Sequence, residues 1–174
     1  MAALVVGSTT CDSPPTSPAA TSCGCTLRRI APTNTTMSAV FKSASFALDG
    51  NFATSASTKT VKGETFPWIA LELSPDSLVL VRKVAVVLMA HANAKFFASV
   101  EVRVATSLPT LATKRFEGGA VLGSFEGPGK VGEVVEVGGE EGVMGRYVVI
   151  QREVPSNWAL QAAEILIYSD YSME

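Results

Sequence analysis

The chain has 174 residues, of which 47% are hydrophobic and 17% are charged, and its formal net charge is −2. This composition is that of one globular domain and excludes an intrinsically disordered chain. Basic residues are scattered, so no clustered Lys/Arg surface of a nucleic-acid-binding protein is present, and no stretch approaches the ~20 apolar residues of a membrane-spanning helix.

The N-terminal part differs in composition from the rest of the chain. Residues 1–26 are rich in Ser, Thr, Pro and Ala, so we expect a flexible arm followed by a folded domain over residues 27–174. The three cysteines, Cys11, Cys23 and Cys25, all lie in the arm, which leaves the domain without disulfides. This cysteine usage and the absence of a visible signal peptide favour an intracellular location without fixing it.

From Leu27 onward, short runs of β-branched residues alternate with turn signals. The most apolar run, Leu78–Met89, predicts a fully buried strand. The Val100–Val104 run alternates, which predicts that its valines face the core while Glu101 and Arg103 face solvent.

The second half of the chain continues this pattern. Val134–Val137 and Arg146–Ile150 flank the glycine-rich Gly138–Gly142 segment, which predicts a long hairpin, and Glu164–Tyr168 predicts the last strand. No amphipathic helix longer than two turns is evident. Many short strands separated by turns predict an all-β protein with a sandwich or jelly-roll fold.

Motifs for catalysis are missing. The single histidine, His91, has no neighbouring nucleophile or acid in the sequence, and the Gly127–Lys130 segment lacks the spacing and the Ser/Thr of a phosphate-binding loop. We therefore predict that the protein is not an enzyme, and that Gly127–Lys130 is a turn between strands.

The Asp49-Gly50-Asn51 turn is a candidate cation site. A tight turn of this kind can direct carbonyls and a carboxylate inward, and hard cations such as calcium bind six to eight oxygen ligands. Asp49, Asn51, Ser57 and Glu164 would supply part of such a shell if the fold brings them together. The alternative is an ordinary turn in which the Asp49 side chain caps backbone amides.

Four short motifs, in this order, resemble the discoidin (coagulation-factor type C) domain and, most closely, the fucose-binding F-type lectins. They are Asp49–Asn51, Phe66–Leu73, Gly145–Val148 and Leu160–Tyr168. The resemblance implies a single discoidin-like, galactose-binding-like β-sandwich that binds a ligand through loops at one end.

The resemblance also implies a structural calcium ion that fastens the loops facing the ligand. Transferred to this sequence, its side-chain ligands and two main-chain carbonyls are Phe46 (carbonyl), Asp49, Asn51, Ser57, Ala163 (carbonyl) and Glu164. The fucose-binding His and two Arg of F-type lectins are not retained: the His falls on Thr60, or on Lys59, and the Arg positions fall on Met89 and Phe96. A fucose lectin of the usual kind is therefore not expected.

The loop Ala90–Ala98 replaces those residues with other polar and aromatic side chains. Together with the preceding loop it gives the candidate ligand-binding residues Lys59, Thr60, His91, Asn93, Lys95 and Phe96. An aromatic ring here could stack on a sugar, contact a protein or insert into a membrane surface, or Phe96 and Phe97 could simply cover the end of the sandwich. Of the tryptophans, we expect Trp68 in the core and Trp158 partly exposed.

Two hypotheses for function follow from these residues. The first is a carbohydrate-binding module with a glycan as its partner, since lectin sites place a few polar groups around an aromatic ring. The second is an intracellular module that binds a partner protein within a larger assembly, because a fold does not fix a function. Membrane-surface binding is disfavoured by the net negative charge, and the oligomeric state is left open.

Overall fold

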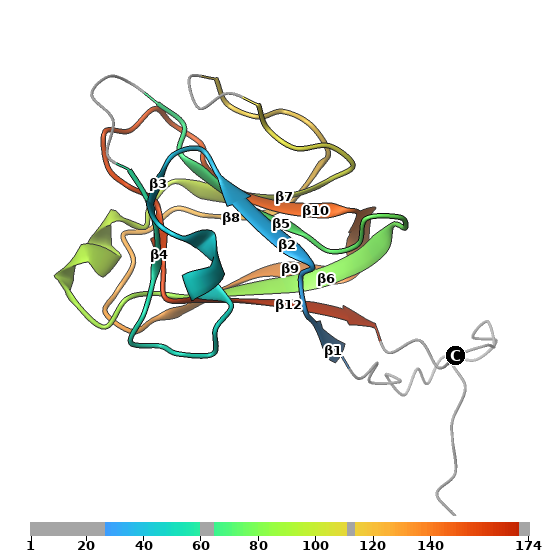
Figure 1. Cartoon of the computed structure of the whole chain (residues 1–174), viewed down its shortest axis with the longest axis horizontal. Coiled ribbons are helices and arrows are strands. Elements are labelled where there is room, and N and C mark those ends of the chain that lie inside the picture. Colours follow the sequence, from blue (N-terminus) through green and yellow to red (C-terminus); the bar gives the residue numbers. More distant parts are fainter. Residues whose placement is uncertain (1–26, 60–64, 111–113, 171–174) are drawn as a thin grey trace, which may run out of the picture.

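The computed structural model describes residues 27–59, 65–110 and 114–170 (Figure 1), so the arm predicted for residues 1–26 lies outside the described part. The regular structure consists of short strands and two 3-10 helices, and no described helix has the length and apolarity to span a bilayer. In chain order the elements are β1 (Leu27–Ile30), β2 (Asn34–Met37), β3 (Val40–Lys42), η1 (Ala44–Ala47), β4 (Ala56–Thr58), β5 (Trp68–Glu72), β6 (Val79–Val87), η2 (Ala92–Phe96), β7 (Val100–Ala105), β8 (Ala120–Phe125), β9 (Val134–Gly145), β10 (Tyr147–Arg152), β11 (Gln161–Ala162) and β12 (Glu164–Asp170).

The strands form three antiparallel sheets. One has the order β1-β12-β6-β9, the second β2-β5-β10-β7-β8, and the third, smaller sheet β11-β4-β3. Figure 1 shows the two larger sheets as stacked layers, with the small sheet and both 3-10 helices toward one end. The predicted all-β sandwich is confirmed.

The core lies between the two larger sheets and is built from alternate residues of their strands. Val148 and Ile150 of β10 enter the core from the five-stranded sheet, and Ile165 and Ile167 of β12 enter it from the four-stranded sheet. Successive side chains of a strand point to opposite faces, so this alternation gives each sheet one apolar inner face. Burying each such side chain contributes about 1.5–3 kcal/mol.

The hairpin predicted around Gly138–Gly142 was wrong. The chain continues through this segment as β9, which pairs with β6, and β10 then begins in the other large sheet between β5 and β7. β9 and β10 are consecutive in the chain but thus belong to opposite layers of the sandwich. The Gly127–Lys130 segment does connect two strands, β8 and β9, as predicted.

The glycine-rich segment makes an irregularity in β9 rather than a turn. The register shifts between Val81 and Lys83 of β6, where β9 accommodates extra residues. Gly138 has φ +130°, and a Cβ at this position would lie 2.1 Å from the Arg82 carbonyl oxygen. Only glycine allows this approach, so the segment bulges where the sequence suggested a reversal.

The inner face of β7 is as the alternation predicted, but its outer face is not exposed to solvent as expected. Val100, Val102 and Val104 are buried in the main core as predicted. The prediction that Glu101 and Arg103 face solvent was wrong, because their exposed fractions are only 1% and 9%. At these residues the outer face of the sheet is covered by residues 115–119, which precede β8.

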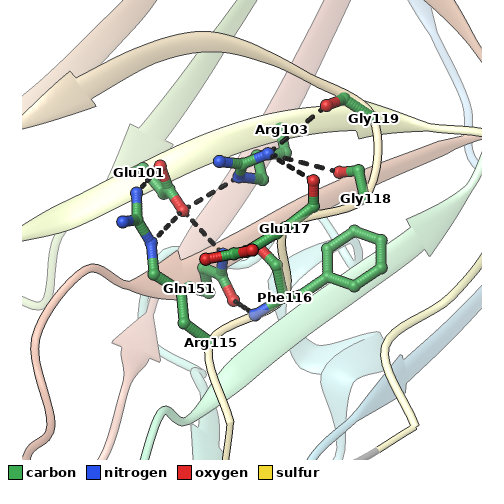
Figure 2. Close-up of polar contacts among 8 residues, drawn as sticks. All are labelled: Glu101, Arg103, Arg115, Phe116, Glu117, Gly118, Gly119 and Gln151. Carbon is green, nitrogen blue, oxygen red and sulfur yellow. Dashed lines mark hydrogen bonds and ion pairs between the residues drawn. The ribbon is translucent and has the colours of Figure 1, made fainter.

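A polar network holds this covering segment in place (Figure 2). Arg115 donates through Nε and Nη2 to the two Glu101 carboxylate oxygens at 2.9 and 2.7 Å. Arg103 Nε and Gln151 Nε2 donate to Glu101 Oε1 at 2.9 and 2.7 Å. The Gln151 amide also pairs with the main-chain N–H and carbonyl of Phe116. Burial opposes ionisation of Glu101, but these hydrogen bonds outweigh it and hold its pKa below the ordinary value.

A second, small apolar cluster lies on the same outer face. Trp68 and Ala70 of β5 pack there with Val149 of β10, and Phe116 covers them. Trp68 is therefore buried as predicted, but on the opposite side of the sheet from the main core.

Candidate functional site

The loop after β6 carries most of the predicted ligand residues at one end of the sandwich (Figure 1). His91 caps η2, because its Nδ1 accepts a hydrogen bond from the Asn93 N–H at 3.4 Å. Both side chains are exposed. Phe97 is buried in the core, whereas Phe96 is only partly buried. Phe97 therefore covers the end of the sandwich, and Phe96 is left near the surface.

Phe96 forms an aromatic pair with Trp158 from the loop between β10 and β11. The two ring centroids are 4.1 Å apart and the ring planes differ by 10°. Lys95 Nζ lies 5.3 Å from the Phe96 centroid. Trp158 is nonetheless 56% exposed, which confirms the expected partial exposure. This aromatic pair presents a flat apolar surface to solvent at the loop end.

Arg152 joins the two loops that carry the aromatic pair. It lies at the end of β10, where the Trp158 loop begins, and its two Nη atoms donate to the carbonyls of Phe96 and Ala98. The guanidinium is buried and has no carboxylate partner among the described residues, and this burial lowers its pKa. A buried cation of this kind is costly unless it is hydrogen-bonded. The two carbonyls satisfy the Nη atoms, whereas Nε is buried without a hydrogen-bond partner among the described residues.

The other predicted ligand residues lie on the loop after β4. Lys59 is exposed, and its N–H donates to the Ala39 carbonyl at 2.8 Å. No described contact joins Lys59 to the aromatic pair. Thr60 lies outside the described residues.

Three oxygen atoms converge on the hydroxyl of Thr54. Thr54 Oγ1 lies 2.7 Å from the Asn51 carbonyl oxygen, 2.8 Å from Asp49 Oδ2 and 3.4 Å from the Phe46 carbonyl oxygen. A hydroxyl has one proton to donate, so it can satisfy only one of these acceptors at a time. We call Phe46, Asp49, Asn51 and Thr54 the oxygen cluster.

Glu164, at the start of β12, faces this cluster with 0% exposure. Its Oε2 accepts from the Gly50 N–H at 3.3 Å, and its Oε1 accepts from Arg29 Nη2 at 3.0 Å. Burial raises the pKa of Glu164, and the nearby Asp49 charge acts in the same direction, against the Gly50 N–H and Arg29. Two carboxylates are thus held within electrostatic reach of each other.

Of the residues predicted as cation ligands, Ser57 has its ligand atom engaged elsewhere. Ser57 Oγ donates to the Thr58 carbonyl within β4, and no described contact joins it to the oxygen cluster. The Ala163 N–H donates to the Val87 carbonyl, and no described contact tests the prediction that the Ala163 carbonyl is a ligand. No group of three or more His, Cys, Asp and Glu side chains gathers in the described residues, so a cation here would depend on carbonyl and hydroxyl oxygens as well as carboxylates.

Comparison with known proteins establishes the fold. No protein-family model and no curated protein matches the sequence. Among solved structures, a mutant of the lectin-binding domain of lectinolysin complexed with Lewis b superposes with a TM-score of 0.63 at 20% identity, over 83% of this chain and 97% of that one. The family 32 carbohydrate-binding module of C. perfringens NanJ in complex with galactose gives a TM-score of 0.63 at 16% identity, over 83% of this chain and 100% of that one. The chain has the discoidin-like, galactose-binding-like fold.

An F-lectin from the serum of Morone saxatilis (striped bass) has the same fold as this discoidin-like domain, with a TM-score of 0.59 at 24% identity, over 80% of this chain and 46% of that one. At the two positions where the resemblance to F-type lectins placed arginines, the discoidin-like domain has a buried Met89 and the stacked Phe96.

Two residues of this discoidin-like domain were missed as site residues from the sequence. Trp158 was missed because only the fold brings its ring against Phe96. Thr54 was missed because several hydroxyl residues follow the Asp49–Asn51 turn, and only the folded loop shows which one meets the carbonyls.

Proposed function

We propose that this domain is a non-catalytic carbohydrate-binding module that binds its glycan on the Phe96–Trp158 aromatic pair. The observation that carries the proposal is the exposure of Trp158 while its ring is held flat against Phe96. A large aromatic ring is usually well buried. Here one ring is fixed by stacking and still faces solvent, which suits it to receive the C–H face of a sugar ring.

Polar side chains near the aromatic pair would recognise sugar hydroxyls. We assign this role to His91, Asn93 and Lys95 on the loop that carries Phe96, and keep Lys59, on the loop after β4, as a further candidate contact; Thr60 lies outside the described residues. Lys95 Nζ lies 5.3 Å from the Phe96 centroid, so its ammonium lies beside the aromatic pair. The similar solved structures named for Lewis b and galactose complexes support a glycan as the ligand class.

A glycan array tests this proposal. We expect saturable binding of the full chain to a defined sugar and its loss in Trp158→Ala. The matched control is Leu78→Ala, which removes another exposed apolar side chain, just before the start of β6, the strand whose other end leads to η2. A folded protein that binds no glycan, or Trp158→Ala binding that equals that of Leu78→Ala, would exclude this site.

We further propose that the oxygen cluster and Glu164 bind a structural calcium ion. The donor set fits, because a carboxylate, two carbonyls and a hydroxyl already converge and a second, buried carboxylate lies beside them. Phe46, Asp49, Asn51, Thr54 and Glu164 would hold the ion, with Thr54 in place of Ser57. Its charge would offset the repulsion between the carboxylates and fasten the loop between η1 and β4.

The second candidate function is a protein-interaction module. It is favoured by Val40, Phe41 and Phe52, three large apolar side chains of the β3–β4 region that are mostly exposed. Exposed apolar side chains of this kind are typical of interaction surfaces. A blank glycan array, together with a protein that co-purifies with the wild-type chain but not with Phe41→Ser/Phe52→Ser, would replace the carbohydrate proposal with this one.

A further inference from the structure

Arg29 places a positive charge on a carboxylate of the proposed calcium site. Its Nη2 lies 3.0 Å from Glu164 Oε1, and the Arg29 side chain is 52% exposed while that of Glu164 is 1% exposed. Arg29 belongs to β1, which among the described strands is an edge strand paired with β12. A guanidinium from the surface thus reaches a carboxylate that is otherwise sealed from water.

We infer that Arg29 is a built-in competitor of calcium for Glu164, which stabilises the metal-free domain and weakens calcium binding. The inference rests on the calcium part of the proposed function and is independent of the glycan part. Arg29 would lower the calcium affinity of the site, because its guanidinium and the metal ion share the Glu164 carboxylate.

The charge of Arg29 has opposite effects on the metal-free and the calcium-bound domain. Without metal, Arg29 is the positive partner that offsets the Glu164 charge, and a buried carboxylate that loses such a partner is strongly destabilising. With a divalent cation on the same carboxylate, two positive charges lie within a few ångströms of each other and repel. Because Arg29 is half-exposed, water screens part of this repulsion, so we expect an effect of about tenfold on calcium affinity.

The chain provides a matched control in the adjacent residue. Arg28 carries the same charge on the same strand, but successive residues of a strand point to opposite faces, and Arg28 stands opposite Ser169 where Arg29 stands opposite Tyr168. No described contact joins Arg28 to Glu164. Arg28→Gln therefore changes the net charge as Arg29→Gln does but leaves the ion pair intact.

The experiment is isothermal titration of calcium chloride into chelator-treated wild-type, Arg29→Gln and Arg28→Gln protein. We expect Arg29→Gln to bind calcium about tenfold more tightly than the wild type and Arg28→Gln to stay within about twofold. In chelator, Arg29→Gln should also melt at a lower temperature than Arg28→Gln, with a larger rise on adding calcium. Calcium affinity of Arg29→Gln equal to or weaker than that of Arg28→Gln would overturn the inference.

A second measurement covers the case in which Arg29→Gln fails to fold. In the wild-type protein, competition requires calcium to weaken the Arg29–Glu164 contact, so NMR should show faster water exchange of the Arg29 guanidinium protons at saturating calcium. Slower exchange would contradict competition. If calcium produces no heat with any variant, both the calcium proposal and this inference fail. Glycan binding measured in chelator tests the glycan proposal independently of both.

Discussion

The Trp158 indole lies nearly parallel to the Phe96 ring at a centroid distance of 4.1 Å, although the two residues come from different loops. Stacked aromatic pairs contribute about 0.5–1.5 kcal/mol beyond the burial of their area. The orientation of the exposed indole therefore depends on a partner that does not itself need to contact the ligand. This dependence gives the first prediction.

Phe96→Ala should leave the domain folded but weaken its binding to the glycan identified on the array by about 0.5–1.5 kcal/mol, because Trp158 loses the ring that holds it flat. Surface plasmon resonance on the immobilised glycan measures this change. Phe96→Tyr, which keeps a ring for stacking, should bind close to the wild type. Equal affinity of Phe96→Ala and Phe96→Tyr would show that the stack does not position Trp158.

Arg152→Met should loosen the aromatic pair without removing either ring. The carbonyls of Phe96 and Ala98 lose their donors, and an unsatisfied buried acceptor costs about 1–3 kcal/mol. Iodide quenching of tryptophan fluorescence reports the result, since Trp68 is buried and Trp158 is exposed. Quenching should increase in Arg152→Met. Arg146→Met, which removes a guanidinium that donates to the Ser74 carbonyl elsewhere in the fold, should leave it unchanged.

Glu101→Gln should destabilise the domain by about 3 kcal/mol, because Arg103 and Arg115 lose their shared counter-charge beneath the covering segment. Urea unfolding at neutral pH measures the change. Glu136→Gln is the matched control: Glu136 pairs with Lys83 at 2.9 Å but is more than half exposed. That substitution should cost less than about 1 kcal/mol. A similar loss of unfolding free energy in the two variants would show that burial does not increase the contribution of the Glu101 ion pairs to stability.

The contribution of Glu101 should also depend on pH. Its pKa in the folded state is below the ordinary 4.5, because hydrogen bonds from Arg115, Arg103 and Gln151 outweigh burial. The folded state therefore binds fewer protons than the unfolded state, so the stabilisation is present above pH 4.5 and is lost as the pH falls through the folded-state pKa. The difference in urea midpoint between wild type and Glu101→Gln should shrink below pH 4.5. A constant difference would contradict the assignment.

Thr54→Val and Ser57→Ala distinguish the two hydroxyls near the Asp49–Asn51 turn. Thr54 Oγ1 meets three oxygens of the cluster, whereas Ser57 Oγ is engaged with the Thr58 carbonyl. Thr54→Val should weaken calcium binding at least about tenfold by removing one ligand, and Ser57→Ala should change it little. Calorimetric titration with calcium compares the two. A larger loss of calcium affinity in Ser57→Ala than in Thr54→Val would identify Ser57 as the ligand in place of Thr54.

The inner faces of the strands could be predicted from the sequence, because the two-residue period of a strand is local. The valines of β7 and the isoleucines of β12 follow this period. The outer face of β7 could not be predicted in this way. Glu101 and Arg103 are covered by the segment containing Arg115, and no local pattern indicates that a later loop will fold back over charged residues.

The glycines of β9 show a second limit. Gly138 and Gly142 have positive φ, as the residues of a tight turn often do, and the same composition serves a bulge. The strand pairing distinguishes a bulge from a turn here. β9 stays paired with β6 on both sides of the bulge, and β10 pairs with β5 and β7. For the candidate site, the Asp49–Asn51 turn and the η2 loop could be proposed from residue types, whereas the contacts of Thr54 and the Phe96–Trp158 stack required the fold.

The pairing of β1 with β12 brings the two ends of the described domain together. Leu27 stands directly opposite Asp170, and Figure 1 shows these strand ends on the side away from η2. The chain therefore enters and leaves the described domain at neighbouring points, on the side away from η2. Copies joined through these ends would each keep the proposed glycan site on the side away from the junction, an arrangement that suits avidity.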